Sequence, residues 1–452
     1  MQDASKSNGK RDTAEHRTVR RARKKADEGR EPDFIPSRLG GRMVSMAALV
    51  ERIVSAFTDE YPEDSPALQE ASGETERLKL LRDTVHYVLA VESVRLAPDE
   101  QAALIRRVYG ELFGYGPLDA LIADTRVTTI ALEGIDKISV RYGHGELVPL
   151  DPIFEDFHHL NQIVSRLLLS GRAELSEDQP FAEVGFEVAG RPICVNFMAP
   201  PVTVYLTIDI RVHPAALPTL DDLVRSEYLT DQAATILRAL IASPHGIVIV
   251  GDTESGKTTL LSVLAQTLPQ SKSTVAVERA GELRLPDAVA GLAVRWPRGD
   301  QPGMTFGEQI GAALEKEPAC MILDEVRADE PESIAPLLRE SNAPRQIWNF
   351  RGPSDAKRLR SALGMVARRA DVSRPEDMAA ALYERLPFVV LVKRARGQIQ
   401  LRGIAEWQFR PGSDYPDFVS LMESGWEGLE LTGSRPARSL PLPDEFWSGA
   451  PG

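Results

Sequence analysis

Residues 245–268 read HGIVIVGDTESGKTTLLSVLAQTL, and this stretch decides the fold. Its first part, 246–250, is a short and largely β-branched apolar run, typical of a strand buried on both faces of a parallel sheet. The following residues, 251–258, fit the phosphate-binding pattern G-x-x-x-x-G-K-[ST]. Leucines then recur at helical spacing up to residue 268. A loop between a strand and a helix N-terminus is the context that this motif requires, so the pattern predicts a phosphate-binding loop.

The residue types in the loop explain the chemistry. The two glycines let the backbone wrap around a polyphosphate, Lys257 would reach the β- and γ-phosphates, and Thr258 would offer its hydroxyl to Mg²⁺. We therefore expect ATP and Mg²⁺ as cofactors. The residues expected to bind the nucleotide are Gly251, Asp252, Thr253, Glu254, Ser255, Gly256, Lys257, Thr258 and Thr259. The carboxylates of Asp252 and Glu254 oppose anion binding unless they point outward, which leaves the strength of binding open.

Composition sets outer limits on the class of protein. The 452 residues are enough for two or three domains, and 43% hydrophobic with 26% charged residues is ordinary for a globular protein. A net charge of −13 argues against a surface built mainly for nucleic acid. Cys194 and Cys320 give neither a disulfide framework nor a zinc spacing, which favours a reducing, cytosolic setting. We expect neither a signal peptide nor a membrane-spanning segment.

Changes in composition and period divide the chain into six segments. They are a basic tail expected to be disordered (1–43), a helical region (44–113), an α+β domain (114–212), a proline-rich hinge (213–219), a P-loop α/β domain (220–409) and a C-terminal tail (410–452). The basic cluster at 19–25 is either an anchor for anionic lipid or nucleic acid or, as its acidic neighbours favour, a solvated stretch. The aromatic residues of the C-terminal tail indicate partner docking or packing back on the core.

The expected elements follow the hydrophobic periods. Three helices are expected within 46–113. The α+β domain should contain strands 128–133, 137–141, 183–188, 192–197 and 203–211 and a helix at 157–169. The P-loop domain should alternate further helices (231–242, 306–314, 332–339, 355–369) with strands (274–277, 320–323, 346–349) and end in a hairpin of 388–392 with 399–404.

A second acidic motif completes the candidate site. Residues 321–325 form an apolar run that ends in Asp324 and Glu325, the position from which P-loop ATPases hold Mg²⁺ or polarise the attacking water. Glu278 and Glu282 follow the preceding strand and could supply further carboxylates to metal or water. Spacing alone fits exposed loop acids equally well for these two residues.

These segments, in this order, resemble the type II/IV secretion-system ATPase family, most closely the CpaF-type ATPases of tight-adherence (Tad) pili. The resemblance covers roughly residues 100–407. Its anchors are 114–118, 194–201, 208–211, 251–259, 277–282 and 323–327. It implies a RecA-like P-loop NTPase domain preceded by a smaller, PAS-like α+β domain.

The resemblance also implies a mechanism and a setting. Members form hexameric rings in which ATP lies between the two domains of one subunit, and domain motions drive pilus assembly or export. By resemblance, Lys257 and Glu325 are catalytic with Glu278 and Arg211, the latter reaching the nucleotide from the N-terminal domain. The metal ligands are expected to be Thr258, Glu282 and Asp324. The expected partners are an inner-membrane platform protein and further copies of the chain, at the cytoplasmic face of the membrane.

The chain departs from the family pattern at several positions. Arg279 stands where members carry aspartate, Asp324 where they carry glycine, and Asn349 at their histidine. Arginines that the family uses around the nucleotide are lost at Gly185 and Cys194. The remaining candidates to replace them are Arg191, Arg279, Arg327 and Arg351.

The departures leave other functions open. A degenerate paralogue could bind nucleotide with little or no hydrolysis and act as a structural or regulatory subunit beside an active paralogous ATPase, because lost arginine contacts slow phosphoryl transfer steeply. A nucleic-acid motor is a weaker alternative, which rests on the phosphate loop and the basic tail.

Overall fold

The computed structural model describes residues 34–36, 43–62, 64–269, 273–340, 342–395, 398–413, 415–425 and 428–448. The chain forms two compact units, one up to Ala120 and one from Leu121 onward. The basic cluster at 19–25, and most of the expected tail at 1–43, lie outside the described residues. Within the described part, none of the helices is both long and apolar enough to cross a lipid bilayer.

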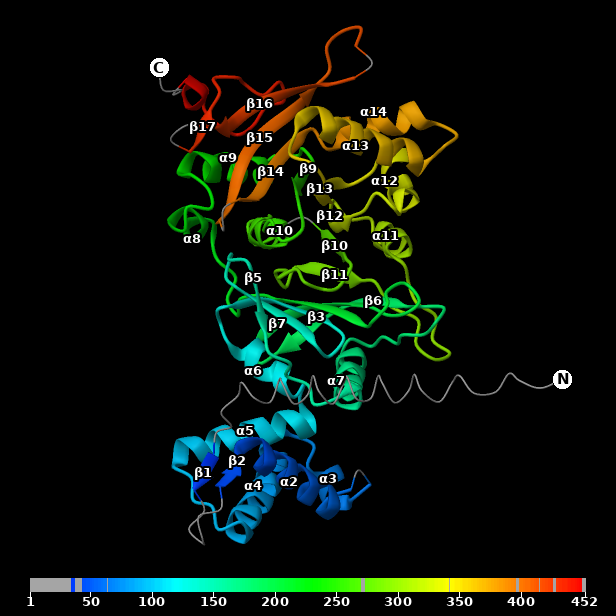
Figure 1. Cartoon of the computed structure of the whole chain (residues 1–452). Helices are drawn as coiled ribbons and strands as arrows, with labels where there is room; N and C mark the ends of the chain where they lie inside the picture. The colour runs from blue at the N-terminus through cyan, green and yellow to red at the C-terminus, as the bar shows by residue number, and fades with distance from the viewer. Residues whose placement is uncertain are drawn as a thin grey trace, which may run out of the picture. The chain divides into compact units, whose positions relative to one another are not determined.

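The first unit is a helical bundle with a short hairpin (Figure 1). Its elements are β1 (Phe34–Pro36), β2 (Met43–Ser45), α2 (Met46–Glu60), α3 (Pro66–Glu70), α4 (Glu74–Val91) and α5 (Pro98–Phe113). Ser45 caps α2 by accepting a hydrogen bond from the Ala48 N–H at 3.2 Å. Leu49, Leu81 and Leu104, one from each long helix, are buried in a common core. The three expected helices are therefore confirmed. A short helix, α6 (Pro117–Ala123), leads into the second unit.

The second unit begins with a six-stranded antiparallel sheet, here called the α+β sheet. Its elements are β3 (Val127–Glu133), β4 (Lys137–Tyr142), β5 (Leu147–Leu150), α7 (Phe157–Ser170), β6 (Phe181–Val188), β7 (Arg191–Met198) and β8 (Thr207–Val212), with strand order β5-β4-β3-β8-β7-β6. The expected strands are present, but β8 begins at Thr207 because the residues from Ala199 form a turn. The edge strand β5 was not predicted, since Pro149 and exposed side chains hide its pattern.

The larger sheet, here called the P-loop sheet, has nine strands in the order β11-β10-β12-β13-β9-β14-β15-β16-β17. The first six strands in this order, from β11 through β9 to β14, are parallel. The pairs β14–β15, β15–β16 and β16–β17 are antiparallel. The elements are α8 (Leu220–Arg225), α9 (Asp231–Ala242), β9 (Ile247–Gly251), α10 (Lys257–Ala265), β10 (Thr274–Glu278), β11 (Val289–Ala293), α11 (Phe306–Leu314), β12 (Cys320–Val326), η1 (Pro331–Ile334), α12 (Ala335–Arg339), β13 (Arg345–Arg351), α13 (Ala356–Ala370), α14 (Pro375–Arg385), β14 (Phe388–Ala395), β15 (Gln398–Gln408), β16 (Asp417–Ser424), β17 (Leu429–Leu431) and η2 (Asp444–Ser448). This confirms the expected P-loop α/β domain and its hairpin.

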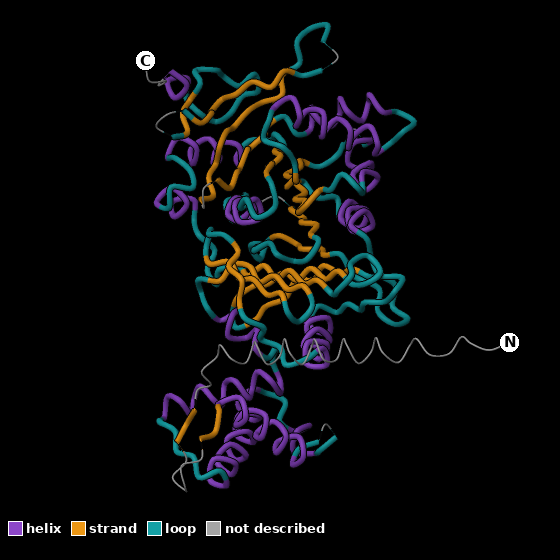
Figure 2. The backbone as a smooth tube through the Cα atoms, in the orientation of Figure 1, coloured by secondary structure: helices purple, strands orange, loops and turns teal. Residues whose placement is uncertain are grey.

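Helices cover both faces of the P-loop sheet (Figures 1 and 2). Alternate residues of β9 face opposite layers: Ile247 and Ile249 pack in the core with α9 and α10, whereas Val248 and Val250 pack with α11 and α13. A strand buried on both faces needs apolar residues at every position, which is the run read in the sequence. β9 therefore delivers the phosphate loop to the carboxyl edge of the sheet, where ligands bind in open α/β folds.

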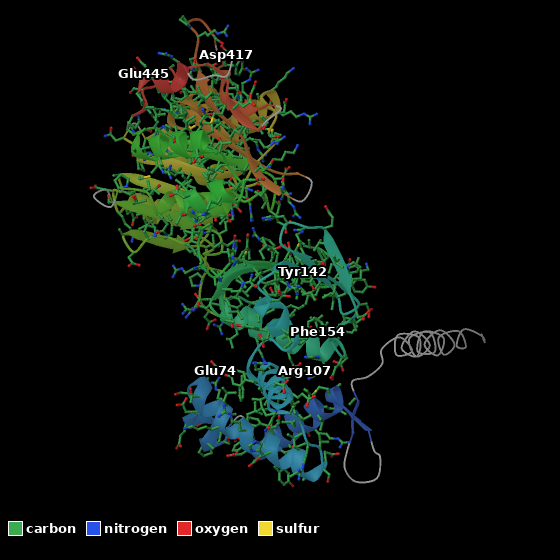
Figure 3. All side chains as sticks on the ribbon, turned by 90° about the vertical axis from the view of Figure 1, so that its left-hand side faces the viewer. Glu74, Arg107, Tyr142, Phe154, Asp417 and Glu445 are labelled. Atoms are coloured by element: carbon green, nitrogen blue, oxygen red, sulfur yellow. The ribbon has the colours of Figure 1, made fainter. Side chains whose placement is uncertain are left out.

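The C-terminal segment is part of the same sheet. β16 and β17 extend it, and Trp447 of η2 is buried in the core. Asp417 at the start of β16 and Glu445 in η2 mark this region in Figure 3. The expected domain end at residue 409 therefore needs correction, and packing back on the core is the alternative that holds for the tail. A Pro-, Gly- and Ser-rich composition hid these short strands.

Candidate nucleotide-binding site

The phosphate loop joins β9 to α10 with the backbone geometry that its glycines permit. Gly256 caps α10 in the left-handed region, with φ of 86°. A Cβ there would also lie 2.9 Å from Ile399 Cγ2, so glycine is required on two grounds. The free N–H groups and the dipole of α10 consequently point into the loop, an arrangement suited to an anion.

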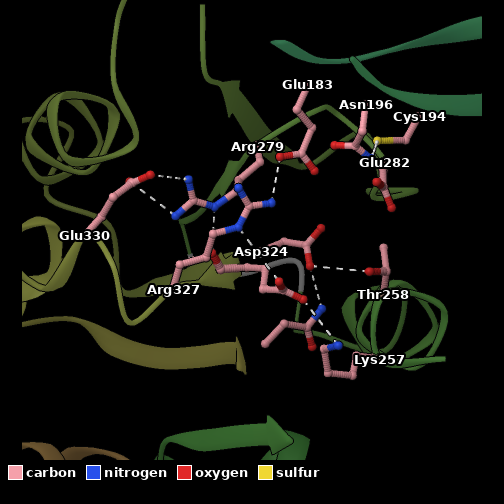
Figure 4. Close-up of polar contacts among 12 residues, drawn as sticks. Glu183, Cys194, Asn196, Lys257, Thr258, Arg279, Glu282, Asp324, Arg327 and Glu330 are labelled. Atoms are coloured by element: carbon pink, nitrogen blue, oxygen red, sulfur yellow. Dashed lines mark hydrogen bonds and ion pairs between the residues drawn. The ribbon is translucent and has the colours of Figure 1, made fainter. Parts of the chain in front are cut away.

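Lys257 and Glu325, assigned to one site from distant motifs, form an ion pair; Figure 4 shows Lys257 beside Thr258 and Asp324. The Lys257 side chain is 5% exposed, its Nζ donates to the Asp252 carbonyl oxygen at 2.9 Å, and it lies 3.2 Å from Glu325 Oε2. Glu325 Oε1 lies 3.9 Å from Arg327 Nε. The ammonium is thus held in the loop by a carbonyl and a carboxylate, with which a polyphosphate would compete.

Thr258, Asp324 and Asn349 form the second group of the site. Thr258 Oγ1 donates to Asp324 Oδ1 at 3.5 Å, and Asn349 Nδ2 donates to the same oxygen at 2.5 Å. A hydroxyl and a carboxylate at this spacing are the hard oxygen ligands that Mg²⁺ prefers. The buried Ser255 Oγ in the loop also has no hydrogen-bond partner among the described residues. These residues fit a metal–nucleotide complex, in which Mg²⁺ would neutralise phosphate charge.

The carboxylate of Glu254 is neutralised by arginines of the chain. It pairs with Arg141 of β4 and with Arg394 of β14, the latter at 3.2 Å, and accepts from Thr129 Oγ1 at 2.9 Å. Burial alone would raise the pKa of Glu254, but hydrogen bonds from Arg141 and Thr129 bring it below its ordinary value. Asp252 is exposed. The repulsion expected from the sequence is therefore largely removed by the ion pairs of Glu254.

Arg211 is held between two carboxylates. It lies 3.2 Å from Glu183 Oε1, 2.8 Å from Glu282 Oε1 and 3.2 Å from Cys194 Sγ. The other Glu282 oxygen lies 3.2 Å from His213 Nε2. Burial would raise the pKa of Glu282, but Arg211 and His213 lower it. In this arrangement Arg211 and Glu282 bind each other, so their expected roles toward nucleotide and metal require a rearrangement and stay predictions.

Three of the four candidate replacement arginines have structural roles. Arg191 donates to the carbonyl oxygens of residues 122, 124, 127 and 213. Arg279 pairs with Glu330 at 3.0 Å and lies over the Phe306 ring at 4.4 Å. Arg327 pairs with Glu183 at 2.6 Å. None of these three is free to meet a nucleotide without breaking its contacts.

The two positions of the lost arginines are closely packed. A Cβ at Gly185 would lie 1.8 Å from the Ala280 carbonyl oxygen, so strand β6 passes directly over the backbone that follows β10. Beside it, Trp296 Nε1 donates to the Glu183 carbonyl oxygen at 2.6 Å. Cys194 is fully buried, and burial raises the pKa of its thiol. These substitutions therefore belong to a direct contact between the α+β sheet and the P-loop domain.

Glu278 lies beneath the site, away from solvent. Its Oε2 accepts from the Leu283 N–H at 2.8 Å. Burial, with smaller contributions from Asp324 and Glu282, raises its pKa to about 8. Burial also raises the pKa of Asp324, as does the charge of Glu282. In the ligand-free protein Glu278 is consequently protonated at neutral pH, a poor state for a general base.

We expect the ligand-free protein to lose stability as pH rises from 5.5 to 8.5. The pKa of Glu278 is about 8 in the folded chain against its ordinary 4.5, so the folded state binds the extra proton between these values. The free energy of unfolding then falls with pH, by at most about 1.4 kcal/mol per pH unit from this one carboxyl. Denaturant titrations at several pH values give the free energy of unfolding against pH. Its fall with pH should be smaller for Glu278→Gln than for wild type. Glu315→Gln, at an exposed site, should show the same fall as wild type. Equal slopes in all three proteins would contradict the assignment.

A cavity of about 1560 Å³ joins these groups. It lies between the α+β sheet and the phosphate loop within the second unit, and its lining includes Arg211, Lys257, Thr258, Glu325 and Arg351. The volume is ample for a nucleoside triphosphate. Sequence reasoning missed the lining residues Glu183, Arg141 and Arg394. They are single charges on unrelated strands, and their only signal was the unusual Glu254 for which two of them provide partners.

The comparisons agree with the class that this geometry defines, a P-loop nucleotide-binding protein. Residues 130–337 match the family model for type II/IV secretion system protein. A Mycobacterium tuberculosis protein named for conjugal transfer is 24% identical over 324 residues, 68% of this chain and 92% of its own. The type IV secretion system protein PtlH of Bordetella pertussis is 24% identical over 214 residues, 46% of this chain and 63% of its own.

Among solved structures, the Legionella pneumophila ATPase DotB is 16% identical with a TM-score of 0.44, over 66% of this chain and 81% of DotB. The family model and the named relatives support the resemblance to type II/IV secretion-system proteins that the motifs indicate, without distinguishing a branch of that family. Residues 130–337, which include the phosphate loop and the acidic pair, are the part of the chain that is similar to this family.

Proposed function

We propose that this protein hydrolyses ATP to power pilus assembly or protein secretion, as a member of the Tad-pilus branch of its family. The observation that carries the proposal is the meeting of Lys257 with Glu325 and of Thr258 with Asp324, at the cavity that Lys257, Thr258 and Glu325 line. Phosphoryl transfer needs positioned cations, a metal and an oriented water, and little covalent chemistry from the protein.

Each group has a distinct task in this proposal. Lys257 and the N–H groups of α10 bind the β- and γ-phosphates, while Thr258 and Asp324 hold Mg²⁺, which spreads the charge that develops on the phosphate oxygens. Binding of the polyphosphate draws Lys257 away from Glu325, at present 3.2 Å distant. The released carboxylate then orients and polarises the attacking water. Glu325 is therefore both a partner of the lysine in the empty loop and the residue that makes hydrolysis possible.

The proposed setting follows the family. We propose a hexameric ring at the cytoplasmic face of the inner membrane, working against a membrane platform protein. The chain has a net charge of −13, which supports a protein partner over nucleic acid.

A second candidate function rests on the ion pairs that Arg211 forms with two glutamates. Both carboxylates that hold it, Glu183 and Glu282, are buried, and Asn349 replaces the histidine of the family pattern. If nucleotide binding does not release Arg211, the charge of the transition state lacks a cation from the α+β sheet. The protein would then bind ATP as a regulatory or structural subunit beside an active paralogue.

Steady-state ATP hydrolysis by the purified protein, with ATP binding measured on the same sample, tests the proposal. We expect Mg²⁺-dependent turnover that Glu325→Gln lowers by about 10²-fold or more, without weaker ATP binding, because the variant removes the acid but keeps the loop. Glu315→Gln, which removes an exposed charge from the same domain, should behave as wild type. Binding without turnover in the wild-type protein would instead favour the regulatory subunit, and absence of binding would contradict both functions.

A further inference from the structure

The cations that line the cavity are almost all neutralised by groups of the chain itself. Their partners are Glu254 for Arg141 and Arg394, Glu183 and Glu282 for Arg211, Glu183 for Arg327, Glu325 for Lys257, Asp124 for Arg126, and backbone carbonyl oxygens for Arg191. A bound polyphosphate must therefore exchange with an existing partner to gain any of these charges. Such exchange reduces the net affinity that each cation contributes.

Arg351 is different. It lines the same cavity, it is exposed, and its side chain makes no hydrogen bond or ion pair with any described residue. It stands at the end of β13, and the parallel register with β9 places it opposite Gly251, the first residue of the phosphate loop. A free guanidinium thus lies at the strand edge from which the loop departs.

The alternation of β13 fixes the face on which Arg351 lies. Ile347 packs in the core with the leucines of α10, whereas Trp348 and Phe350 pack with α11 and α13. Asn349, on the Ile347 face, reaches Asp324. Residues two apart in a strand share a face, so Arg351 is on the side of α10 and of the metal-binding pair.

The strand order shows which strands lie on either side of Arg351. β13 lies between β9, which carries the phosphate loop, and β12, which carries Asp324 and Glu325. Phe350 pairs with Val326, so Arg351 is level with residue 327, two residues beyond Glu325 toward the carboxyl edge. A cation there has the phosphate loop on one side and the proposed water-activating acid on the other.

We propose that Arg351 binds the terminal phosphate of the nucleoside triphosphate. The proposal rests on the proposed function of the site and adds the residue that senses the γ-phosphate. A guanidinium fits phosphate oxygens through two parallel hydrogen bonds and needs no partner exchange here.

Calorimetric titration of the full-length protein with ATP and with ADP, in the presence of Mg²⁺, tests this role. We expect Arg351→Ala to weaken ATP binding about 10-fold or more, the value of a charge-assisted hydrogen bond, and to change ADP binding less than about threefold. Arg351→Lys should recover part of the difference. Arg358→Ala, which removes an exposed arginine of α13 outside this cavity, is the matched control and should leave both affinities unchanged.

The outcomes separate this inference from the proposed function. Equal ATP affinity in wild type and Arg351→Ala would overturn the inference while leaving the function intact. Equal weakening of ATP and ADP would also overturn it, because the contact would then be to phosphates that both ligands share. A wild-type protein that binds neither nucleotide would contradict the proposed function, whatever the variant does. Arg351 has no partner among the described residues, so we expect the variant to unfold as wild type does.

Discussion

Lys257→Ala is expected to reduce ATP turnover to background and to weaken ATP binding by about 100-fold. The buried ammonium is held 2.9 Å from the Asp252 carbonyl oxygen, so it is already oriented in the loop before ligand arrives. Its removal also leaves Glu325, now 3.2 Å from Nζ, without its cation and close to the incoming triphosphate. Loss of a charge-assisted contact and gain of repulsion act in the same direction, at about 1.5–3 kcal/mol for the contact alone.

The repulsive part can be measured separately. If Glu325 opposes ATP in Lys257→Ala, the double variant Lys257→Ala/Glu325→Gln should bind ATP more tightly than the single one, which is a coupling that a double-mutant cycle detects. Lys316→Ala, at an exposed position after α11, is the control for loss of one positive charge and should bind as wild type. Turnover within threefold of wild type in Lys257→Ala would exclude this loop as the catalytic site.

Gly185→Ala is expected to lower the free energy of unfolding by about 2–3 kcal/mol, and Gly185→Arg by more. The added Cβ would lie 1.8 Å from the Ala280 carbonyl oxygen, a backbone atom that no side-chain rotation can move away. Strand β6 must then separate from the backbone after β10, with loss of the Trp296 hydrogen bond to the Glu183 carbonyl oxygen. An arginine at this position would therefore disrupt the contact between β6 and the backbone after β10.

Hydrogen exchange and denaturant unfolding would check this expectation. We expect faster exchange in residues 181–188 and 279–296 of both variants, because these segments face each other across the contact. Gly311→Ala is the matched control: its Cβ would meet nothing within 4 Å on α11, and alanine is the better helix former, so stability should stay equal or rise. Unchanged stability and exchange in Gly185→Ala would show that the contact is not made in solution.

Gly185 and Cys194 lie in the same region of the second unit. The loss of the side chain at residue 185 allows the close approach to Ala280, and the cysteine at 194 lies within the group of Glu183, Arg211 and Glu282. Gly185 and Cys194 are thus part of a packed contact between the α+β sheet and the P-loop domain.

Much of the secondary structure could be predicted from short stretches of the sequence. The run at 246–250, the glycines of the loop and the leucines after it predicted β9, the phosphate loop and α10, because burial on both faces and close backbone approach leave few residue types possible. The sequence also predicted that Glu325 belongs to the same site as Lys257, since parallel strands present their carboxyl ends at one edge; their direct ion pair was not predicted. The edge strands β5 and β17, and β16 beside β17, were missed, because exposed residues, proline and glycine mask their alternation.

The sequence by itself determined the phosphate loop, its strand and helix, and the acidic pair that faces it. The tertiary structure decided which charges are free. Glu254 is neutralised by arginines from β4 and β14, Arg211 is held by two buried glutamates, and Arg351 has no described partner. Local motifs follow from short-range backbone and burial requirements, whereas an ion pair depends on which distant strands meet. That pairing is set by the packing of the two sheets and leaves no periodic trace in the chain.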